Sequence, residues 1–363
     1  MTLNVLWSDD TTQYLICDSA RTHNQPPRFT HTNLEQLQTN NRGLTVEEGA
    51  QKIIPLTPVN AAALCGSEHE ALTFLKLAKR ACEGKPDELI RYAENCSRFA
   101  TTVAVTDPTH ESPFQVYQLD QKVISSVARY GVTTLGSLND RECGFLSDAI
   151  GLNLIASGQH MTPRLKLVHA LAYAMNMSAQ FNLTAESVGG AFFGAMVNDS
   201  KFLWQPDIMY VLYSPQTIRA VFEPNEGSPL NDFDAHALRI TVQVRNNVGI
   251  SASLRTNRIA LSTSELLTPD VRSWVQNWAT PAALESFTNP EFFVFIPTSQ
   301  GQTVIVENTG HSVRATPTSF DLKGDLVDLL ASIPDTPFRC VHLLPNPEHK
   351  TIQELEDERQ SAV

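Results

Sequence analysis

Thr2 stands directly behind the initiator methionine and directly before an apolar segment, residues 3–8. Once Met1 is removed, this threonine carries two reactive groups at the N-terminus. Its hydroxyl can attack a carbonyl carbon, and its own α-amine can take up the hydroxyl proton, directly or through a water molecule. The pKa of an ordinary α-amine is about 7.7–8.0, which suits a general base near neutral pH. Thr2 is therefore a candidate nucleophile that brings its own base, although threonine at position 2 is also common without any such role.

Two charged residues lie in apolar segments, where an unpaired charge is costly. Lys52 opens the stretch KIIPL, and Asp18 ends the stretch TQYLICD. A buried lysine needs a buried counter-charge, and Asp18 would be that partner. The alternative interpretation is that Lys52 lies on an exposed edge strand and that Asp18 pairs with a neighbour such as Arg21.

Gly66 is placed to act as a hydrogen-bond donor. It lies between an apolar strand and a predicted helix whose start carries the capping box Ser67-x-x-Glu70. A backbone amide at a helix N-terminus can donate to a developing oxyanion, and the helix dipole strengthens this interaction. Glycine also lets a substrate carbonyl come close to the backbone. The same residue makes a good helix start without any catalysis.

The elements that must position these residues come in blocks of one kind. In the first 215 residues, strands are expected at 3–8, 12–18, two short runs within 51–65, 101–107, 113–120, 130–136, 192–199 and 207–215, and helices at 67–83, 86–99, 139–155 and 163–181. Such blocks are typical of α+β layers rather than of alternating βαβ units. The long polar segment 23–49, between the second strand and Lys52, is expected to be an insertion or a mobile flap.

Five features recur together in register: Thr2, Asp18 sixteen positions later, the pair Lys52-Ile53, Gly66 fourteen positions after the lysine, and Gly136-Ser137 between a strand and a helix. In these residue types and intervals, roughly residues 2–215 resemble the proteasome β-subunits, a family of N-terminal nucleophile (Ntn) hydrolases. The family carries the same residues at the head of its first strand, the end of its second, the start of its third, the start of its first long helix and a later strand-to-helix turn.

The resemblance implies a four-layer αββα sandwich and a threonine-type hydrolase that cleaves peptide or amide bonds through an acyl-Thr2 intermediate. Lys52 and Asp18 would keep the Thr2 amine neutral, because a nearby positive charge disfavours the ammonium form. Gly66 would supply the oxyanion donor, and Ser137 would hold the amine or its water in place. The resemblance also implies a homo-oligomer with a ring-like assembly of the kind that the family forms, and it identifies no regulator, metal or cofactor.

The sequence departs from the family pattern in the loop after the last helix. The family motif Asp-x-x-Ser-Gly-Gly corresponds here to the stretch NLTAESVGG. Gly189-Gly190 are retained and Ser187 stands in for the serine, but no aspartate occupies the matching place. Glu186 could substitute for it only with a shifted backbone. The insertion 23–49 also makes the interval between Asp18 and Lys52 about twice the usual one.

Beyond residue 215 the resemblance ends. Strands are expected at 236–246, 250–262, 291–297, 303–308 and 338–345, and helices at 268–279 and 321–333. We interpret residues 216–347 as an additional α+β region, which could cap the site or build a different oligomer. Residues 348–363 form a charged tail that we expect to be flexible.

Composition excludes several classes of partner. The formal net charge of −12 argues against nucleic acids and anionic membranes, which require clustered Lys and Arg. No apolar run approaches a membrane span, and the N-terminus lacks a signal-peptide pattern, so a cytoplasmic location is expected. The six cysteines are scattered, so no disulfide framework, metal site or cofactor site is predicted.

Three interpretations follow from these residues. The first is a proteasome-like threonine hydrolase acting on peptides or other amides. The second keeps the fold without the chemistry, as an inactive structural or interaction subunit, and the missing aspartate favours it. The third is a small-amide Ntn hydrolase with the same nucleophile and a different pocket. The intact Thr2–Asp18–Lys52–Gly66 register favours the first, because a scaffold has no physical need for a buried lysine facing its own N-terminus.

Overall fold

The computed structural model describes residues 3–24, 40, 42–48, 52–66, 74, 75, 77, 79, 91, 102–106, 112–118, 123–136, 138, 140–156, 161–181, 183, 187–189, 192–198, 201–213, 238–245, 248–253, 258–262, 290–297, 303–307, 313–316, 319–322 and 342–344. The predicted helix 268–279 and the charged tail 348–363 lie outside these residues, as does all of the predicted helix 86–99 except Arg91. Of the predicted helix 67–83, residues 74, 75, 77 and 79 are described, and all four are helical.

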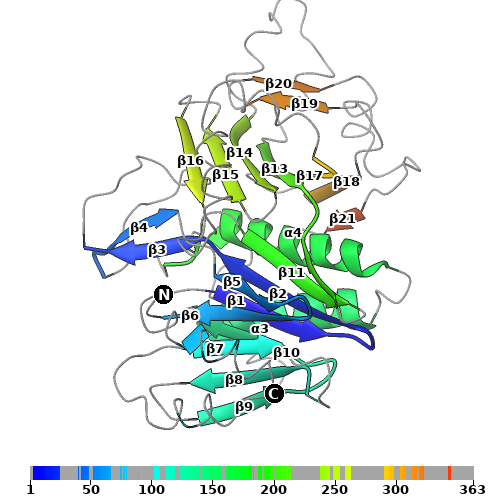
Figure 1. The fold of residues 1–363 in the computed structure, drawn as a ribbon. Helices are drawn as coiled ribbons and strands as arrows, with labels where there is room; N and C mark the ends of the chain where they lie inside the picture. Colours follow the sequence, from blue (N-terminus) through cyan, green and yellow to red (C-terminus); the bar gives the residue numbers. More distant parts are fainter. Residues whose placement is uncertain are drawn as a thin grey trace, which may run out of the picture.

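The first sheet is antiparallel, has five strands and contains the N-terminal hairpin (Figure 1). Its order is β10 (Val132–Gly136), β1 (Leu3–Ser8), β2 (Thr12–Asp18), β11 (Phe192–Asn198) and β12 (Lys201–Trp204). The predicted strands 3–8 and 12–18 are confirmed. Asp9 makes the turn between them, since its Oδ1 accepts from the amides of Thr11 and Thr12.

The second sheet is a five-stranded antiparallel meander with two buried faces. Its strands follow chain order: β5 (Ile53–Thr57), β6 (Asn60–Cys65), β7 (Thr102–Thr106), β8 (Phe114–Gln118) and β9 (Val123–Val127). Ala61 and Ala63 join the large core that the first sheet also enters. The alternating residues Ala62 and Leu64 instead cluster with the helical residue Phe74. Successive side chains of a strand point to opposite faces, so this sheet is covered on both sides.

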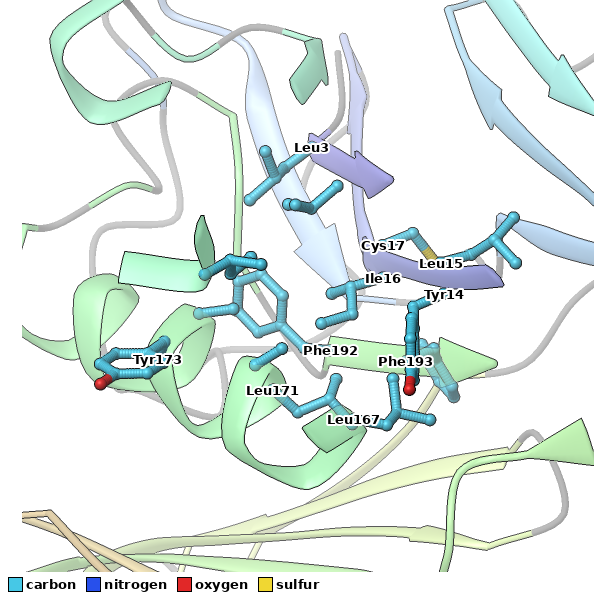
Figure 2. Close-up of a cluster of buried hydrophobic side chains, with 14 of the residues drawn as sticks. Leu3, Tyr14, Leu15, Ile16, Cys17, Leu167, Leu171, Tyr173, Phe192 and Phe193 are labelled. Atoms are coloured by element: carbon cyan, nitrogen blue, oxygen red, sulfur yellow. The ribbon is translucent and has the colours of Figure 1, made fainter. Parts of the chain in front are cut away.

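Helix α4 (Pro163–Phe181) packs on the first sheet against β2 and β11. Figure 2 shows Leu167 and Leu171 of this helix beside Ile16 of β2. A Cβ atom at Gly194 would lie 2.9 Å from Leu167 Cδ1 and 3.0 Å from Leu171 Cδ1. Glycine at this position therefore allows the helix to approach the strand closely. The predicted helix 139–155 is instead α3 (Asp140–Ile150) followed by a π-helical segment, Gly151–Ala156.

A third sheet covers the other side of α4 (Figure 1). Its order is β16 (Arg258–Ser262), β15 (Val248–Ser253), β14 (Leu238–Arg245), β13 (Ile208–Tyr213), β17 (Phe292–Pro297), β18 (Thr303–Glu307) and β21 (His342–Leu344). Strand β13 pairs antiparallel with β14 and parallel with β17. This sheet therefore takes strands from both sides of the predicted boundary at residue 215.

Two short ribbons complete the described strands. Strand β3 (Ala20–His23) pairs with β4 (Thr45–Glu48), and β19 (Val313–Thr316) pairs with β20 (Ser319–Leu322). The segment 23–49 thus begins and ends in paired strands. Residues 321 and 322, predicted as the start of a helix, belong to β20 instead, because they pair with Arg314 and Val313. Among the described helices, none combines the length and the apolar character needed to cross a membrane.

Candidate active site

The residues predicted for the site divide into two groups. Asp18, Lys52, Gly66, Ser187 and Gly189 are described by the structure. The other predicted site residues, Thr2, Ser137 and Glu186, lie outside the described residues.

Asp18 is fully buried at the end of β2 and accepts four hydrogen bonds. Its Oδ1 accepts from the Leu3 amide at 2.9 Å and from Lys52 Nζ at 2.7 Å. Its Oδ2 accepts from the amides of Ala20 at 3.1 Å and Gly189 at 3.2 Å. Hydrogen bonds from backbone amides and an ammonium group stabilise the charged form of a carboxylate. Through these four bonds, Asp18 connects the first residue of β1, the first residue of the strand that follows β2, the residue before β5, and the loop at Gly189.

Lys52 is the counter-charge of Asp18, which is the pairing that its apolar sequence context predicts. It lies immediately before β5 and is only 8% exposed. Its carbonyl oxygen accepts from the Leu64 amide at 2.9 Å, which fixes the backbone of Lys52 on the neighbouring strand β6. Both the head and the base of this side chain are therefore held in place.

The Leu3 amide links this carboxylate to the N-terminus. That amide nitrogen belongs to the peptide bond that joins residue 3 to Thr2, and consecutive Cα atoms lie about 3.8 Å apart. Leu3 N and Lys52 Nζ share one acceptor, at 2.9 and 2.7 Å, so these nitrogens are at most about 5.6 Å apart. The positive charge of Lys52 is thus held close to the backbone nitrogen of Leu3.

Gly66 lies at the end of β6, directly after Cys65, and is exposed. Its φ angle is +106°, a backbone conformation that glycine adopts readily and other residues rarely do. Strand β6 is the same strand that holds the Lys52 carbonyl through Leu64. Gly66 and Lys52 therefore lie on one pair of strands near the same end.

Two cysteines near the ion pair are poor candidates for the nucleophile. Burial raises the pKa of the Cys17 thiol to about 12, and the nearby charge of Lys52 opposes this only in part. Burial also raises the pKa of Cys65. A thiol is nucleophilic as the thiolate, so both side chains are inert at neutral pH. The sequence-based choice of a hydroxyl rather than a thiol nucleophile is consistent with these environments.

Ser187 lies in the loop that leads to Gly189 and is fully buried. Its φ angle is +67°, which is uncommon for a residue other than glycine. The Val188 amide donates to the Leu183 carbonyl at 3.1 Å and closes the loop. Asn40 Nδ2 donates to Ser187 Oγ at 2.7 Å. The contact places one residue of the insertion beside this loop.

Asn40 is a residue of the site that sequence reasoning missed. Its Oδ1 accepts from the amides of Arg42 and Leu44, each at 2.9 Å, and Gly43 has a φ of +74°. The stretch NNRGL carries the turn signal for this local structure. That signal predicts a turn and contains nothing that points to Ser187.

In the described part of the chain, no three His, Cys, Asp or Glu side chains are grouped so that they could bind a metal ion.

No model of a protein family and no curated protein matches the sequence. Among solved structures, eukaryotic HslV from Trypanosoma brucei matches with a TM-score of 0.37 and 11% identity, over 54% of the present chain and 99% of that protein. A likeness this weak supports no conclusion about fold or activity.

Proposed function

We propose that the protein is a proteasome-like N-terminal threonine hydrolase that cleaves peptide or amide bonds through an acyl-Thr2 intermediate. One observation carries the proposal. A single oxygen of the buried Asp18 binds both the Lys52 ammonium and the amide that joins Leu3 to Thr2. A positive charge near an N-terminal amine disfavours protonation of that amine, because the two like charges would repel each other. Such an amine is available as a base at neutral pH.

The proposed reaction has two halves. In the first, the Thr2 amine takes the hydroxyl proton while Oγ attacks the substrate carbonyl carbon. The carbonyl oxygen becomes negative, and the Gly66 amide donates to it. The C–N bond then breaks, the leaving nitrogen takes the proton from the Thr2 ammonium, and an ester remains on Oγ. In the second half, water attacks the ester, one of its protons passes through the amine back to Oγ, and the carboxylic acid is released.

The remaining predicted residues have supporting roles in this proposal. Asp18 fixes Lys52 and the start of β1, while Gly189 supplies one of its amide donors. Ser137 and Ser187 hold the amine, or the water that serves it, in place. Glu186 takes the place of the missing aspartate only if the backbone is shifted there.

We also propose that the two five-stranded sheets form the inner layers of an αββα sandwich. Helix α4 supports the outer layer on the first sheet, and the helical residues Phe74 and Leu75 support it on the second. Side chains of both sheets share one core, which includes Leu15 and Ala63. A homo-oligomer is part of the same proposal, and native mass spectrometry would measure its size.

An inactive subunit of the same fold is the second candidate. The observation that favours it is the loop Leu183–Gly189, which has no aspartate where the resembled family carries one. A small-amide hydrolase would share Thr2 and differ in substrate preference, which profiling with peptide and small amides would reveal.

The intact mass of the purified protein tests the proposal, before and after incubation with a peptide epoxyketone. This reagent captures an N-terminal threonine through both its hydroxyl and its amine. We expect loss of Met1 and an adduct of the full reagent mass, and Thr2→Ala should abolish the adduct. Retained Met1 with no adduct on the wild-type protein would leave the inactive subunit as the better conclusion.

A further inference from the structure

A buried hydrogen bond connects the segment between β3 and β4 to the loop that contains Gly189, one of the donors to Asp18. Asn40 Nδ2 donates to Ser187 Oγ at 2.7 Å, and the two residues are 147 positions apart. Asn40 is 6% exposed and Ser187 is fully buried. Gly189, two residues further on, donates its amide to Asp18 Oδ2. The bond therefore ties the segment between β3 and β4 to the loop that completes the donors around Asp18.

The direction of this hydrogen bond is fixed by the other half of the Asn40 side chain. Oδ1 accepts from the amides of Arg42 and Leu44. A flipped amide would place its NH₂ group against these two N–H donors, so Nδ2 faces Ser187. Ser187 Oγ is therefore an acceptor in this bond, and its own proton is left to donate to another group. Among the described residues, no acceptor for that proton is present.

A carboxylate partner would act in the opposite sense. It would accept the Ser187 proton and leave the hydroxyl as an acceptor only. The chain lacks an aspartate in this loop and has instead a buried amide from the insertion. The two partners therefore differ in hydrogen-bond direction: an amide donor leaves the serine proton free to donate to another group, whereas a carboxylate would take it.

We propose that Asn40 is a positioning residue of the hydrolase, which acts through Ser187. It fixes the Ser187 hydroxyl as a donor to the Thr2 amine, or to the water that serves that amine, and it holds the loop that leads to Gly189. This inference rests on the proposed function. It also gives the insertion 23–49 a part in the proposed chemistry, since this segment supplies Asn40.

The decisive variant is Asn40→Asp. Its carboxylate keeps the two acceptor bonds to Arg42 and Leu44 and so preserves the local turn, but it loses the donor to Ser187. Asn40→Ser is a second variant without an added charge, because a serine can cap the same turn and is too short to reach Ser187. Ser187→Ala removes the other partner.

Asn176→Asp is the matched control. Asn176 is also a buried asparagine whose Nδ2 donates to a hydroxyl far away in the sequence, that of Thr303, at 2.5 Å. It joins α4 to β18 and lies outside the proposed site. Both aspartate variants thus bury a similar new carboxylate, and only one of them alters the bond to Ser187.

Inactivation by the peptide epoxyketone gives a binding constant and a maximal rate of adduct formation, and thermal unfolding is measured alongside. We expect Asn40→Asp, Asn40→Ser and Ser187→Ala each to lower the maximal rate by about tenfold, with the binding constant unchanged. Asn176→Asp should lower only thermal stability. The double variant Asn40→Asp/Ser187→Ala should be no slower than Ser187→Ala alone, since both changes break one interaction.

Three outcomes would overturn the inference. The first is a maximal rate equal to that of wild type in folded Asn40→Asp or Asn40→Ser. The second is a double variant whose rate is reduced by the product of the two single effects. The third is an Asn176→Asp variant that slows the reaction as much as Asn40→Asp does. In each case the hydrolase itself would stand, because the wild type reacts. Absence of any adduct on the wild type would instead remove the proposed function and this inference together.

Discussion

Two lysine–aspartate pairs brace the β1–β2 hairpin, one at each end. Lys52 Nζ lies 2.7 Å from Asp18 at the end of β2, and Lys166 Nζ lies 2.7 Å from Asp9 in the turn. Both lysine side chains are 10% exposed, whereas the aspartates differ, with Asp18 at 0% and Asp9 at 15%. Distance and charge are therefore nearly the same in the two pairs, and their surroundings are what differ.

Asp9 is held mainly by its own neighbours. The amides of Thr11 and Thr12 and the hydroxyl of Tyr14 donate to it, and only Lys166 comes from a distant segment. Burial opposes its ionisation, but the hydrogen bonds from Lys166, the Thr11 amide and Tyr14 hold the pKa of Asp9 below its ordinary value. This pair clamps a turn onto helix α4 and needs no further role to explain it.

Asp18 is held mainly by segments that are far away in the sequence. Lys52 and Gly189 reach it from positions 34 and 171 residues away, and Leu3 reaches it from the other strand of the hairpin. Asp18 therefore ties together segments that are remote in the sequence, at the amide of the first described residue, Leu3. The comparison teaches that the source of the donors, rather than the ion pair itself, separates a candidate catalytic pair from a structural one.

Lys52→Met should have the largest effect. It leaves the fully buried Asp18 without its counter-charge, which typically costs roughly 3–5 kcal/mol of unfolding free energy. It also removes the charge that we propose keeps the Thr2 amine neutral, so we expect the rate of epoxyketone adduct formation to fall by at least about 100-fold. Urea unfolding and inactivation kinetics measure the two effects. A folded Lys52→Met protein that reacts at the wild-type rate would contradict a catalytic role for this pair.

Lys166→Met is the same substitution at the other pair, and we expect it to lower stability by a smaller amount without slowing adduct formation. Asp9 keeps three other donors and some contact with water, so we expect a loss of about 1–3 kcal/mol in urea unfolding. The rate of adduct formation should stay within about twofold of wild type, because the described hydrogen bonds of Asp9 involve Thr11, Thr12, Tyr14 and Lys166 and none of the described site residues. If the two lysine variants slow adduct formation equally, the distinction between the pairs fails.

The smallest effect is expected from the titration of Asp9. Because its pKa in the folded protein lies below the ordinary value of 3.8, its contribution to stability is present above that value and is lost as the pH falls through the folded pKa. Wild type and Asp9→Asn should therefore differ in unfolding free energy at pH 6, and the difference should shrink toward pH 3. Guanidinium unfolding at the two pH values measures it. A difference that stays constant or grows on acidification would show that Asp9 is not stabilised as an anion.

Local patterns in the sequence were enough to predict the parts of the site that depend on one strand. The apolar runs around Asp18 and Lys52 indicate burial, and a buried charge requires a partner, so their pairing could be predicted. The strands 3–8 and 12–18 are predicted to the residue, because two short, largely apolar runs lie on either side of an Asp9-Asp10 turn. The catalytic roles of these residues stay predictions.

Other parts depend on contacts that no local pattern encodes. Asn40 lies in a polar segment with no periodicity, and its bond to Ser187 crosses 147 positions. The pairing of β13 with β14 and β17 could not be predicted either, because the sequence of a strand does not show which other strands it pairs with. The division of the chain at that residue followed the end of a resemblance rather than the end of a sheet.

The place of α4 between two sheets has a consequence for handling the protein. Residues 166–178 of this helix are all buried, and its outer side is covered by β17 and β18, where Asn176 bonds to Thr303. A shortened chain that stopped at residue 215 would leave β13 with neither of its partners, β14 and β17, and would turn an apolar helix face toward water. Such a fragment would be poorly suited to tests of the proposed activity, which are best done on the whole 363-residue chain.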